Sequence, residues 1–248
     1  MAWFDEVFNG SYDRFTFHRF TPEQNHKEAE FIRTAMQLHA GEEVLDLACG
    51  FGRHAVPLAR RGIRVTGMDV TARYIEMART RAGELPVEFV VGDIRELDYE
   101  ERFDAAYSYF TSFGFFDDDT NFDILRRVAR ALRPGGRFLL DTANREMWVG
   151  SENPYREFFE FEEGGRKMVV VNASTFDFET GISNAVLRLY GGPDGPEEMR
   201  FSVRLYSLAE LRWLLRRAGL ELVKAFGDCD SSPYSAESSR LIVLAHKI

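Results

Sequence analysis

Short apolar segments alternate with amphipathic segments through the first part of the chain. The apolar segments lie at 44–47, 65–68, 87–91, 103–110 and 132–141. Between two of them, Tyr74, Ile75, Ala78 and Ala82 recur at the spacing that places side chains on one face of a helix. Strands that alternate with helices in this way predict an α/β fold with a parallel sheet.

Four helix starts are indicated by residues that can accept hydrogen bonds from the first backbone N–H groups. Thr21 precedes Pro22, Thr71 follows a predicted strand, acidic residues occupy 117–119, and Ser207 lies three positions before a glutamate. The helix after 117–119 is expected to run to Leu132, and the one after Ser207 to end at Gly219.

The segment 44–53 is the most informative in the chain. It predicts a strand that breaks into a turn containing Gly50 and Gly52, followed by a helix at 53–61 that ends at Gly62. Pro57 falls near the first helical turn, where a missing N–H costs least. Glycines let the backbone approach a ligand, and a helix start offers free N–H groups, so the segment predicts a nucleotide-type pocket.

Two ligands compete for this pocket. The stretch 50–55 also satisfies the dinucleotide pattern G-x-G-x-x-G/A, with Asp69 at the distance expected for a ribose contact. Asp46, however, interrupts the strand four positions before Gly50. A carboxylate there repels a pyrophosphate and suits a ligand that carries an ammonium and a sulfonium. The acidic residue therefore favours the second kind of ligand.

The segment resembles the first motif of the class I S-adenosylmethionine-dependent methyltransferases, which is hydrophobic-Asp-x-x-x-Gly-x-Gly. Later segments follow that family in order: 65–69 resembles its second strand, 87–94 its third, 103–110 its fourth and 132–141 the approach to its fifth. The resemblance covers roughly residues 40–145. It implies a Rossmann-like, doubly wound, seven-stranded and mostly parallel sheet, with a final antiparallel strand near 241–245.

The resemblance also implies S-adenosyl-L-methionine as cofactor. Asp69 would hold the ribose hydroxyls, the glycine turn would lie beside the methionine part, and the N-terminal segment with Tyr12 would fold over the cofactor. The full set of expected cofactor-binding residues is Tyr12, Asp46, Ala48, Gly50, Gly52, Arg53, Asp69, Val70, Gly92, Asp93, Ile94 and Phe110.

Between about 157 and 206 the alternation of strands and helices stops. Four β-like runs are separated by glycine-containing turns, and Met199, Phe201, Val203 and Leu205 alternate with polar residues. The pattern predicts a small antiparallel β insert at 151–206, between core segments 41–150 and 207–248, with 1–40 as an N-terminal helical cap. The insert is either a lid over the acceptor pocket or a dimer surface, so the protein is expected to be a monomer or a homodimer.

A sulfonium methyl group is already activated, so the enzyme needs positioning groups more than a metal or a covalent nucleophile. Side chains near the ends of the fourth and fifth strands, in the insert and in the loop 228–234 are candidates to line the acceptor site. The expected catalytic residues are Tyr109, Asn144, Arg145, Tyr206 and Tyr234, with Arg204 in the same pocket. His54 is expected to face the helix surface.

The net charge of −9 argues against a nucleic-acid acceptor, because phosphate neutralisation needs a basic surface. No apolar run approaches the ~20 residues of a membrane span, and two cysteines without metal-ligand spacing indicate a reduced, cytoplasmic setting with no metal. A small-molecule methyl acceptor is expected. Two rival functions remain: an NAD-dependent oxidoreductase, for which no Tyr-x-x-x-Lys pair is present, and a non-catalytic S-adenosylmethionine-binding module.

Overall fold

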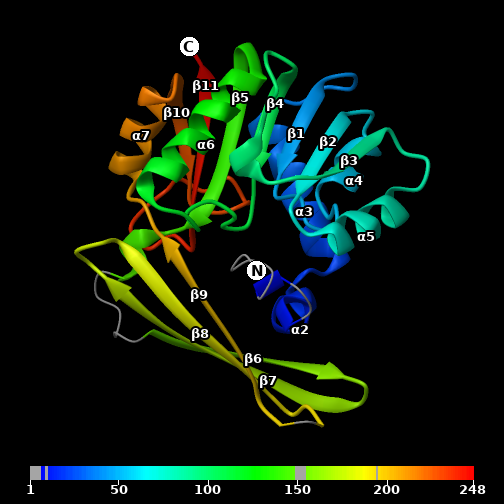
Figure 1. Cartoon of the computed structure of the whole chain (residues 1–248), viewed down its shortest axis with the longest axis vertical. Helices are drawn as coiled ribbons and strands as arrows, with labels where there is room; N and C mark the ends of the chain where they lie inside the picture. The colour runs from blue at the N-terminus through cyan, green and yellow to red at the C-terminus, as the bar shows by residue number, and fades with distance from the viewer. Residues whose placement is uncertain (1–6, 9–10, 149–154, 194) are drawn as a thin grey trace.

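The computed structural model describes residues 7–8, 11–148, 155–193 and 195–248, which form two sheets (Figure 1). The strands of the larger sheet are β1 (Glu43–Leu47), β2 (Arg64–Asp69), β3 (Val87–Val91), β4 (Phe103–Ser108), β5 (Leu132–Ala143), β10 (Leu220–Phe226) and β11 (Arg240–Lys247). Their order is β10-β11-β5-β4-β1-β2-β3; β11 runs antiparallel to both of its neighbours, and the other adjacent strands are parallel. The predicted seven-stranded sheet with a final antiparallel strand is confirmed.

Helices cover both faces of this sheet. They are α3 (Pro22–Ala35), α4 (Ala55–Ala59), α5 (Ala72–Ala82), α6 (Asp118–Ala131) and α7 (Leu208–Arg217), with the short helices α2 (Ser11–Thr16), η1 (Phe17–Arg19), η2 (Ile94–Glu96) and η3 (Arg145–Trp148). Ile32, Val56 and Ile75 of α3, α4 and α5 belong to one buried cluster. Leu125 and Leu215 of α6 and α7 belong to another. The two clusters lie on opposite faces, as a doubly wound fold requires.

The predicted helix starts agree with the structure at three positions. The Thr21 side chain accepts a hydrogen bond from Gln24 N–H, Asp117 accepts one from Thr120 N–H, and Ser207 forms a capping box. Thr71 occupies the cap position of α5, but its side chain makes no capping hydrogen bond.

The helix predicted at 53–61 is shorter than expected. It spans only Ala55–Ala59, because the residues before it are used in the turn that carries Gly50 and Gly52. Both glycines have positive φ angles, of 54° and 72°, which are incompatible with a right-handed helix. Pro57 lies in the first turn of α4, where its missing N–H has no partner to lose.

The second sheet is a four-stranded antiparallel unit in the order β6-β7-β8-β9. Its strands are β6 (Tyr155–Glu163), β7 (Arg166–Asp177), β8 (Ile182–Tyr190) and β9 (Glu197–Arg204). The sheet falls within the predicted insert at 151–206, of which 151–154 lie outside the described residues. The exact domain borders stay a prediction.

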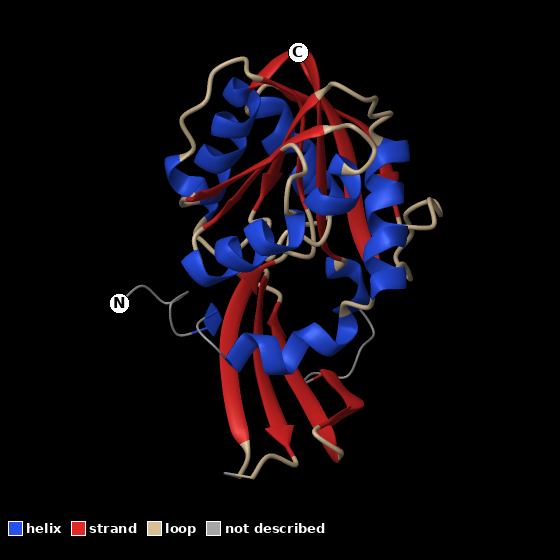
Figure 2. Cartoon of the chain, turned by 90° about the vertical axis from the view of Figure 1, so that its right-hand side faces the viewer, coloured by secondary structure: helices blue, strands red, loops and turns tan. Residues whose placement is uncertain are grey.

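The insert sheet lies over the carboxyl edge of the large sheet, with α2 between the two (Figures 1 and 2). Its inner face packs against this helix: Phe15 of α2 belongs to one buried cluster with Val170, Leu187 and Met199 of the insert. Active sites of open α/β sheets lie at this edge. The insert is therefore placed where it can form a wall of a ligand site.

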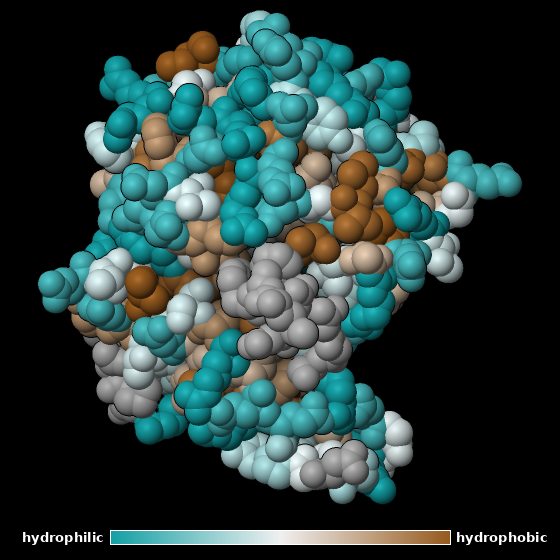
Figure 3. Space-filling model, viewed as in Figure 1, coloured by the Kyte–Doolittle hydropathy of each residue, from teal (hydrophilic) through white to brown (hydrophobic). Residues whose placement is uncertain are grey.

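Hydrophilic residues cover most of the face of the molecule shown in Figure 3, over the core and the insert alike. None of the helices in the described ranges combines the length and the apolar character needed to cross a membrane.

Candidate active site

The turn after β1 has a backbone that requires small residues. Ala48, Gly50 and Gly52 all have positive φ angles, of 56°, 54° and 72°. A Cβ atom on Gly52 would lie 2.9 Å from the ring of Phe89, so that position has room for no side chain. Gly50 instead borders open space. The turn therefore exposes its backbone on one side and packs tightly on the other.

Asp69, the last residue of β2, is fixed beside this turn. Its Oδ2 accepts a hydrogen bond from Gly50 N–H and its Oδ1 accepts one from Thr71 N–H, both at 2.8 Å. Burial raises the pKa of Asp69, and the two backbone hydrogen bonds oppose this shift. The carboxylate is thus held rigidly with 8% of the residue exposed.

A cavity opens between this turn, β3 and α2, and is here called the loop cavity. It contains most of the residues expected to bind the cofactor: Tyr12, Ala48, Gly50, Asp69, Val70, Gly92, Asp93 and Ile94. Phe8, Tyr74 and Ser112 also line it and were not predicted as cofactor residues. The inward-facing position of Tyr74 in its helix was a usable signal, whereas nothing in the sequence placed Phe8 here.

A second cavity, the inner cavity, continues from the first toward Asp46, Arg53 and Phe110. Asp46 Oδ2 and one terminal nitrogen of Arg53 are buried, and neither has a hydrogen-bond partner among the described residues. Burial raises the pKa of Asp46 to about 7, an effect that the neighbouring Tyr107 hydroxyl and the positive charge of Arg53 reduce. The inner cavity therefore offers one acidic and one cationic group to a ligand that carries both charges.

Arg53 is anchored from behind by α3. Glu28 accepts a hydrogen bond from Arg53 Nη1. A second hydrogen bond, of 2.8 Å, joins Glu28 to His54 Nε2. The guanidinium lies 4.5 Å from the ring centroid of Phe20 and 5.1 Å from that of Phe110. These contacts fix the direction in which its unpaired nitrogen points.

The prediction that His54 faces the helix surface was wrong. Only 4% of His54 is exposed, because α3 packs over it and supplies Glu28. Burial lowers the pKa of His54 to about 4 and keeps the ring neutral. Burial would raise the pKa of Glu28, but the hydrogen bond with His54 and the charge of Arg53 hold it well below its usual range.

Phe110, just beyond β4, is strained and clamped. Its φ angle is 69°, which a bulky residue rarely adopts. Its N–H donates a 2.6 Å hydrogen bond to Asp141 Oδ2, and Asp141 is fully buried in an ion pair with Arg240 at 2.5 Å. Such strain persists where the surroundings over-determine it, often at functional sites.

Two larger cavities meet the inner cavity at Phe110. The insert cavity, about 290 Å³, is mostly apolar and is lined by residues that include Tyr12, Ser112, Val170, Ala185, Leu187, Met199 and Phe201. The polar cavity, about 460 Å³, is lined by residues that include Arg19, Phe20, Glu28, Asn144, Glu157, Asn172, Asp228 and Arg240. Together they provide the room that a small-molecule site needs.

The structure does not bring the expected acceptor residues together. Tyr109 lines the inner cavity and Asn144 the polar cavity. The Asn144 amide donates to three carbonyl oxygens in 235–238, and its Oδ1 accepts from the Tyr234 hydroxyl. Asn144 and Tyr234 thus fasten the loop between β10 and β11, and their roles toward an acceptor stay predictions.

The other three expected residues, Arg145, Arg204 and Tyr206, lie in a separate polar network at the base of the insert. The Tyr206 hydroxyl donates a 2.6 Å hydrogen bond to Asp118, and Arg145 and Arg204 both pair with Glu210. None of the three belongs to the lining of the insert or polar cavity among the described residues. The expectation placed Arg145 by the end of the fifth strand and the other two by their position in the insert, whereas residues of α6 and α7 bind all three side chains.

Comparisons with known proteins agree with this geometry. A family model described as a methyltransferase domain matches residues 44–136. The cypemycin N-terminal methyltransferase of Streptomyces sp is 30% identical over 208 residues, which are 84% of this chain and 84% of that protein. The chain belongs to the class I S-adenosylmethionine-dependent methyltransferases.

Solved methyltransferases share the whole architecture. The CcbJ methyltransferase from Streptomyces caelestis has a TM-score of 0.77 and 25% identity, with 90% of this chain and 89% of that chain covered. The S-adenosylmethionine-bound CalS10, an amino pentose methyltransferase from Micromonospora echinaspora, has a TM-score of 0.70 at 22% identity, with 91% of each chain covered. Coverage of this extent includes both the core and the insert.

S-adenosylmethionine is the cofactor of this methyltransferase, and the residues present fit it. The unpaired atoms of Asp46 and Arg53 match the ammonium and carboxylate of its methionine part, and Asp69 suits its ribose hydroxyls. Among the described residues, no group of three or more His, Cys, Asp or Glu side chains could hold a metal ion.

Proposed function

We propose that this methyltransferase transfers the methyl group to an O, N or S atom of a small molecule by in-line displacement. The observation that carries the proposal is the junction at Phe110. There the inner cavity, which fits the methionine part of the cofactor, meets both the insert cavity and the polar cavity. An acceptor in either of these cavities can reach the cofactor from the side of the insert.

The cofactor supplies an electrophilic methyl group, so the protein contributes mainly by positioning. Asp46, Arg53 and Asp69 would hold the cofactor in one orientation. Tyr12 and Ser112 line both the inner and the insert cavity, and thus form the boundary across which the acceptor approaches. The apolar lining of the insert cavity would exclude water and favour an acceptor with an apolar body.

The rival reading as a non-catalytic S-adenosylmethionine-binding module requires the acceptor side to be filled. Here a cavity of about 290 Å³ lies on that side, which supports an enzyme. The relative matched over most of the chain is itself named as an N-terminal methyltransferase, which also supports catalysis.

The proposal is tested by measuring S-adenosylhomocysteine release with a panel of small amines, alcohols, thiols and carboxylates. Ala185→Phe would fill the insert cavity and is expected to reduce turnover of the best acceptor at least tenfold, with cofactor affinity unchanged. Ala173→Phe, one residue before the cavity-lining Ser174 and on the other face of β7, is the matched control. Equal turnover in both variants, or no turnover with any class of acceptor, would refute the proposal.

A further inference from the structure

The inner face of the insert sheet is apolar except near one end. There Glu157 of β6 is the register partner of Asn172 of β7, and Ser174 donates a 2.8 Å hydrogen bond to Asn172 Oδ1. All three residues line the polar cavity. Glu157 has no ion pair or side-chain hydrogen bond among the described residues, although it is half-buried. The charge of Arg19 acts on this carboxylate without a direct contact, and no bonded group offsets the cost of its burial.

Two of the other four charged residues that line the polar cavity are held in ion pairs. Arg240 is bound to Asp141, and Glu28 to Arg53. Three charged groups remain outside ion pairs within the described ranges: the cation Arg19 and the anions Glu157 and Asp228, of which Asp228 accepts a hydrogen bond from Ser239. The balance of these unpaired groups is negative, so the cavity can take up one further cation at little electrostatic cost.

Aromatic rings border the same space. Phe110, Trp148 and Tyr155 line the polar cavity, and the Trp148 and Tyr155 rings lie 5.7 Å apart in an edge-to-face arrangement. The guanidinium of Arg19 lies 4.7 Å from the ring centroid of Phe159 and 5.8 Å from that of Phe110. The Arg19 guanidinium is thus a cation that already packs against aromatic rings where the cavities meet. Aromatic faces next to a carboxylate are the combination that proteins use for ammonium groups.

We propose that the polar cavity is an amine-binding site, in which Glu157 pairs with the ammonium form of the acceptor's nitrogen and the aromatic rings enclose it. The apolar body of this amine would lie in the adjoining insert cavity. This inference rests on the proposed function and narrows the acceptor to a primary or secondary amine.

The chemistry balances with the groups at hand. The bound ammonium gives a proton to the Glu157 carboxylate, and the nitrogen lone pair then forms a bond to the methyl carbon. The carbon–sulfur bond breaks with its electron pair left on sulfur, and the methylated nitrogen carries the positive charge. Burial raises the pKa of Glu157, although the charge of Arg19 opposes the shift, and a higher pKa makes this carboxylate a better proton acceptor.

Probes with one carbon skeleton test the class of acceptor. Benzylamine, benzyl alcohol, benzyl mercaptan and benzoate are compared by S-adenosylhomocysteine release, and their binding to the enzyme saturated with S-adenosylhomocysteine is measured by calorimetry. Benzylamine is expected to bind more tightly than the other three, and to be the preferred acceptor. Stronger binding of the alcohol, the thiol or benzoate would overturn the amine site.

Variants test the assigned residue. Glu157→Gln should raise KM for the amine by about tenfold or more, because a hydrogen bond to a charged group is lost, with cofactor affinity unchanged. Glu157→Asp should restore part of the affinity. The control is Glu160→Gln on the same strand, where the carboxylate pairs with Lys167 instead of lining the cavity. An unchanged KM in Glu157→Gln would overturn the assignment.

The two proposals fail in different ways. Turnover of alcohols or thiols with no preference for amines refutes the amine site and leaves methyl transfer to a small molecule intact. Tight cofactor binding without turnover of any probe, in the wild-type enzyme and across the wider panel, refutes the proposed function as well.

Discussion

The cofactor side and the acceptor side of this site are built by different means. The loop and inner cavities use backbone N–H groups, positive φ angles and buried charges that lie close together in the sequence around 46–53 and at Asp69. The insert and polar cavities use side chains that β6–β9, α2 and the loop after β5 bring together. Cofactor recognition is therefore a property of a local turn, whereas acceptor recognition depends on how the insert docks.

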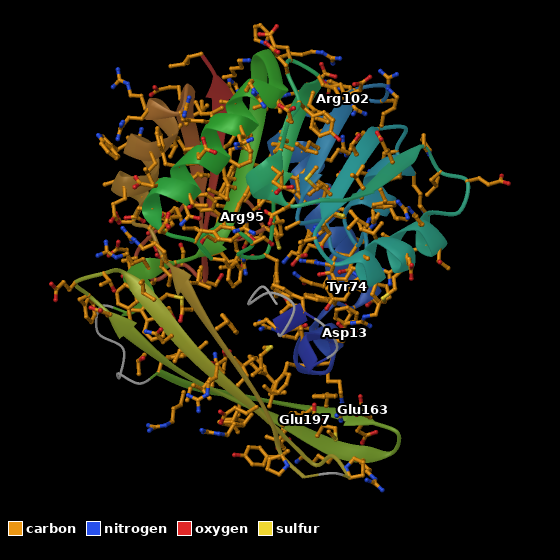
Figure 4. The ribbon with its side chains drawn as sticks, viewed as in Figure 1. Asp13, Tyr74, Arg95, Arg102, Glu163 and Glu197 are labelled. Atoms are coloured by element: carbon orange, nitrogen blue, oxygen red, sulfur yellow. The ribbon has the colours of Figure 1, made fainter. Side chains whose placement is uncertain are left out.

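Helix α2 joins the two sides. Asp13 accepts hydrogen bonds from the Tyr74 hydroxyl and from Arg73, both at 2.5 Å, and both donors belong to α5 of the core. Arg14, the next residue, pairs with two glutamates of the insert, Glu163 and Glu197. These glutamates are labelled in Figure 4, as are Asp13 and Tyr74. Asp13 therefore binds the core and Arg14 binds the insert. Replacing one of them should affect the cofactor side or the acceptor side separately.

The largest effect is expected on the cofactor side from Asp69→Ala. Loss of hydrogen bonds from the ribose hydroxyls to a buried carboxylate should weaken S-adenosylhomocysteine binding by about 1.5–3 kcal/mol, as measured by calorimetry. Asp98→Ala is the control, because Asp98 is exposed and only pairs with Arg130 at the surface. Equal affinities of the two variants would remove Asp69 from the cofactor site.

The next effect is a pH dependence of cofactor affinity, which concerns the cofactor side alone. Because the pKa of Asp46 is about 7 in the free protein, the carboxyl group is protonated below that value and cannot pair with the cofactor's ammonium. Cofactor affinity should rise with pH up to about 7 and then level off, with a slope approaching tenfold per pH unit on the acidic side. In Asp46→Asn this dependence should disappear. A slope that persists in the variant would assign the titration to another group.

A smaller effect is expected from Asp13→Ala, which removes the attachment of α2 to α5. Cofactor affinity should fall by about 1 kcal/mol, since Tyr12 and the rest of α2 would cover the loop cavity less firmly. Combining this change with Tyr74→Phe should cost less than the sum of the two single changes, because each removes the same hydrogen bond. Strict additivity would contradict a direct contact between these residues.

The smallest effect is expected from Glu163→Gln at the insert. Glu163 is 47% exposed and shares Arg14 with Glu197, so this ion pair should contribute less than about 0.5 kcal/mol to stability. The midpoint of thermal unfolding and the cofactor affinity should both stay close to those of the wild type. A weakened cofactor affinity in this variant would show that the insert contributes to cofactor binding after all.

Local signals predicted the parts of the site that local geometry decides. The acidic residue four positions before Gly50, the glycine turn and Asp69 at a strand end anticipated the turn and most of the lining of the loop cavity, because turn conformation depends on neighbouring residues. The capping box at Ser207 was predicted for the same reason, whereas the antiparallel last strand was expected from the family resemblance.

Signals of this kind could not place residues whose partners are distant in sequence. His54 looked like a surface residue because nothing near it indicated that Glu28, 26 positions earlier, would cover it. Tyr206 and Arg145 stood near strand ends, yet Asp118 and Glu210 from two helices bind their side chains. Packing between helices and strands that are distant in sequence determined where each of these side chains lies.

The sequence by itself determined the cofactor half of this methyltransferase, because a strand, a glycine turn and a carboxylate at fixed spacing dictate one local conformation. Only the tertiary structure decided the acceptor half. Glu157 is one of several glutamates in β6, and its place in one cavity with Phe110 and Arg240 follows from how the insert sheet and α2 dock on the carboxyl edge of the core. Such docking depends on buried surface summed over many residues and leaves no short motif in the chain.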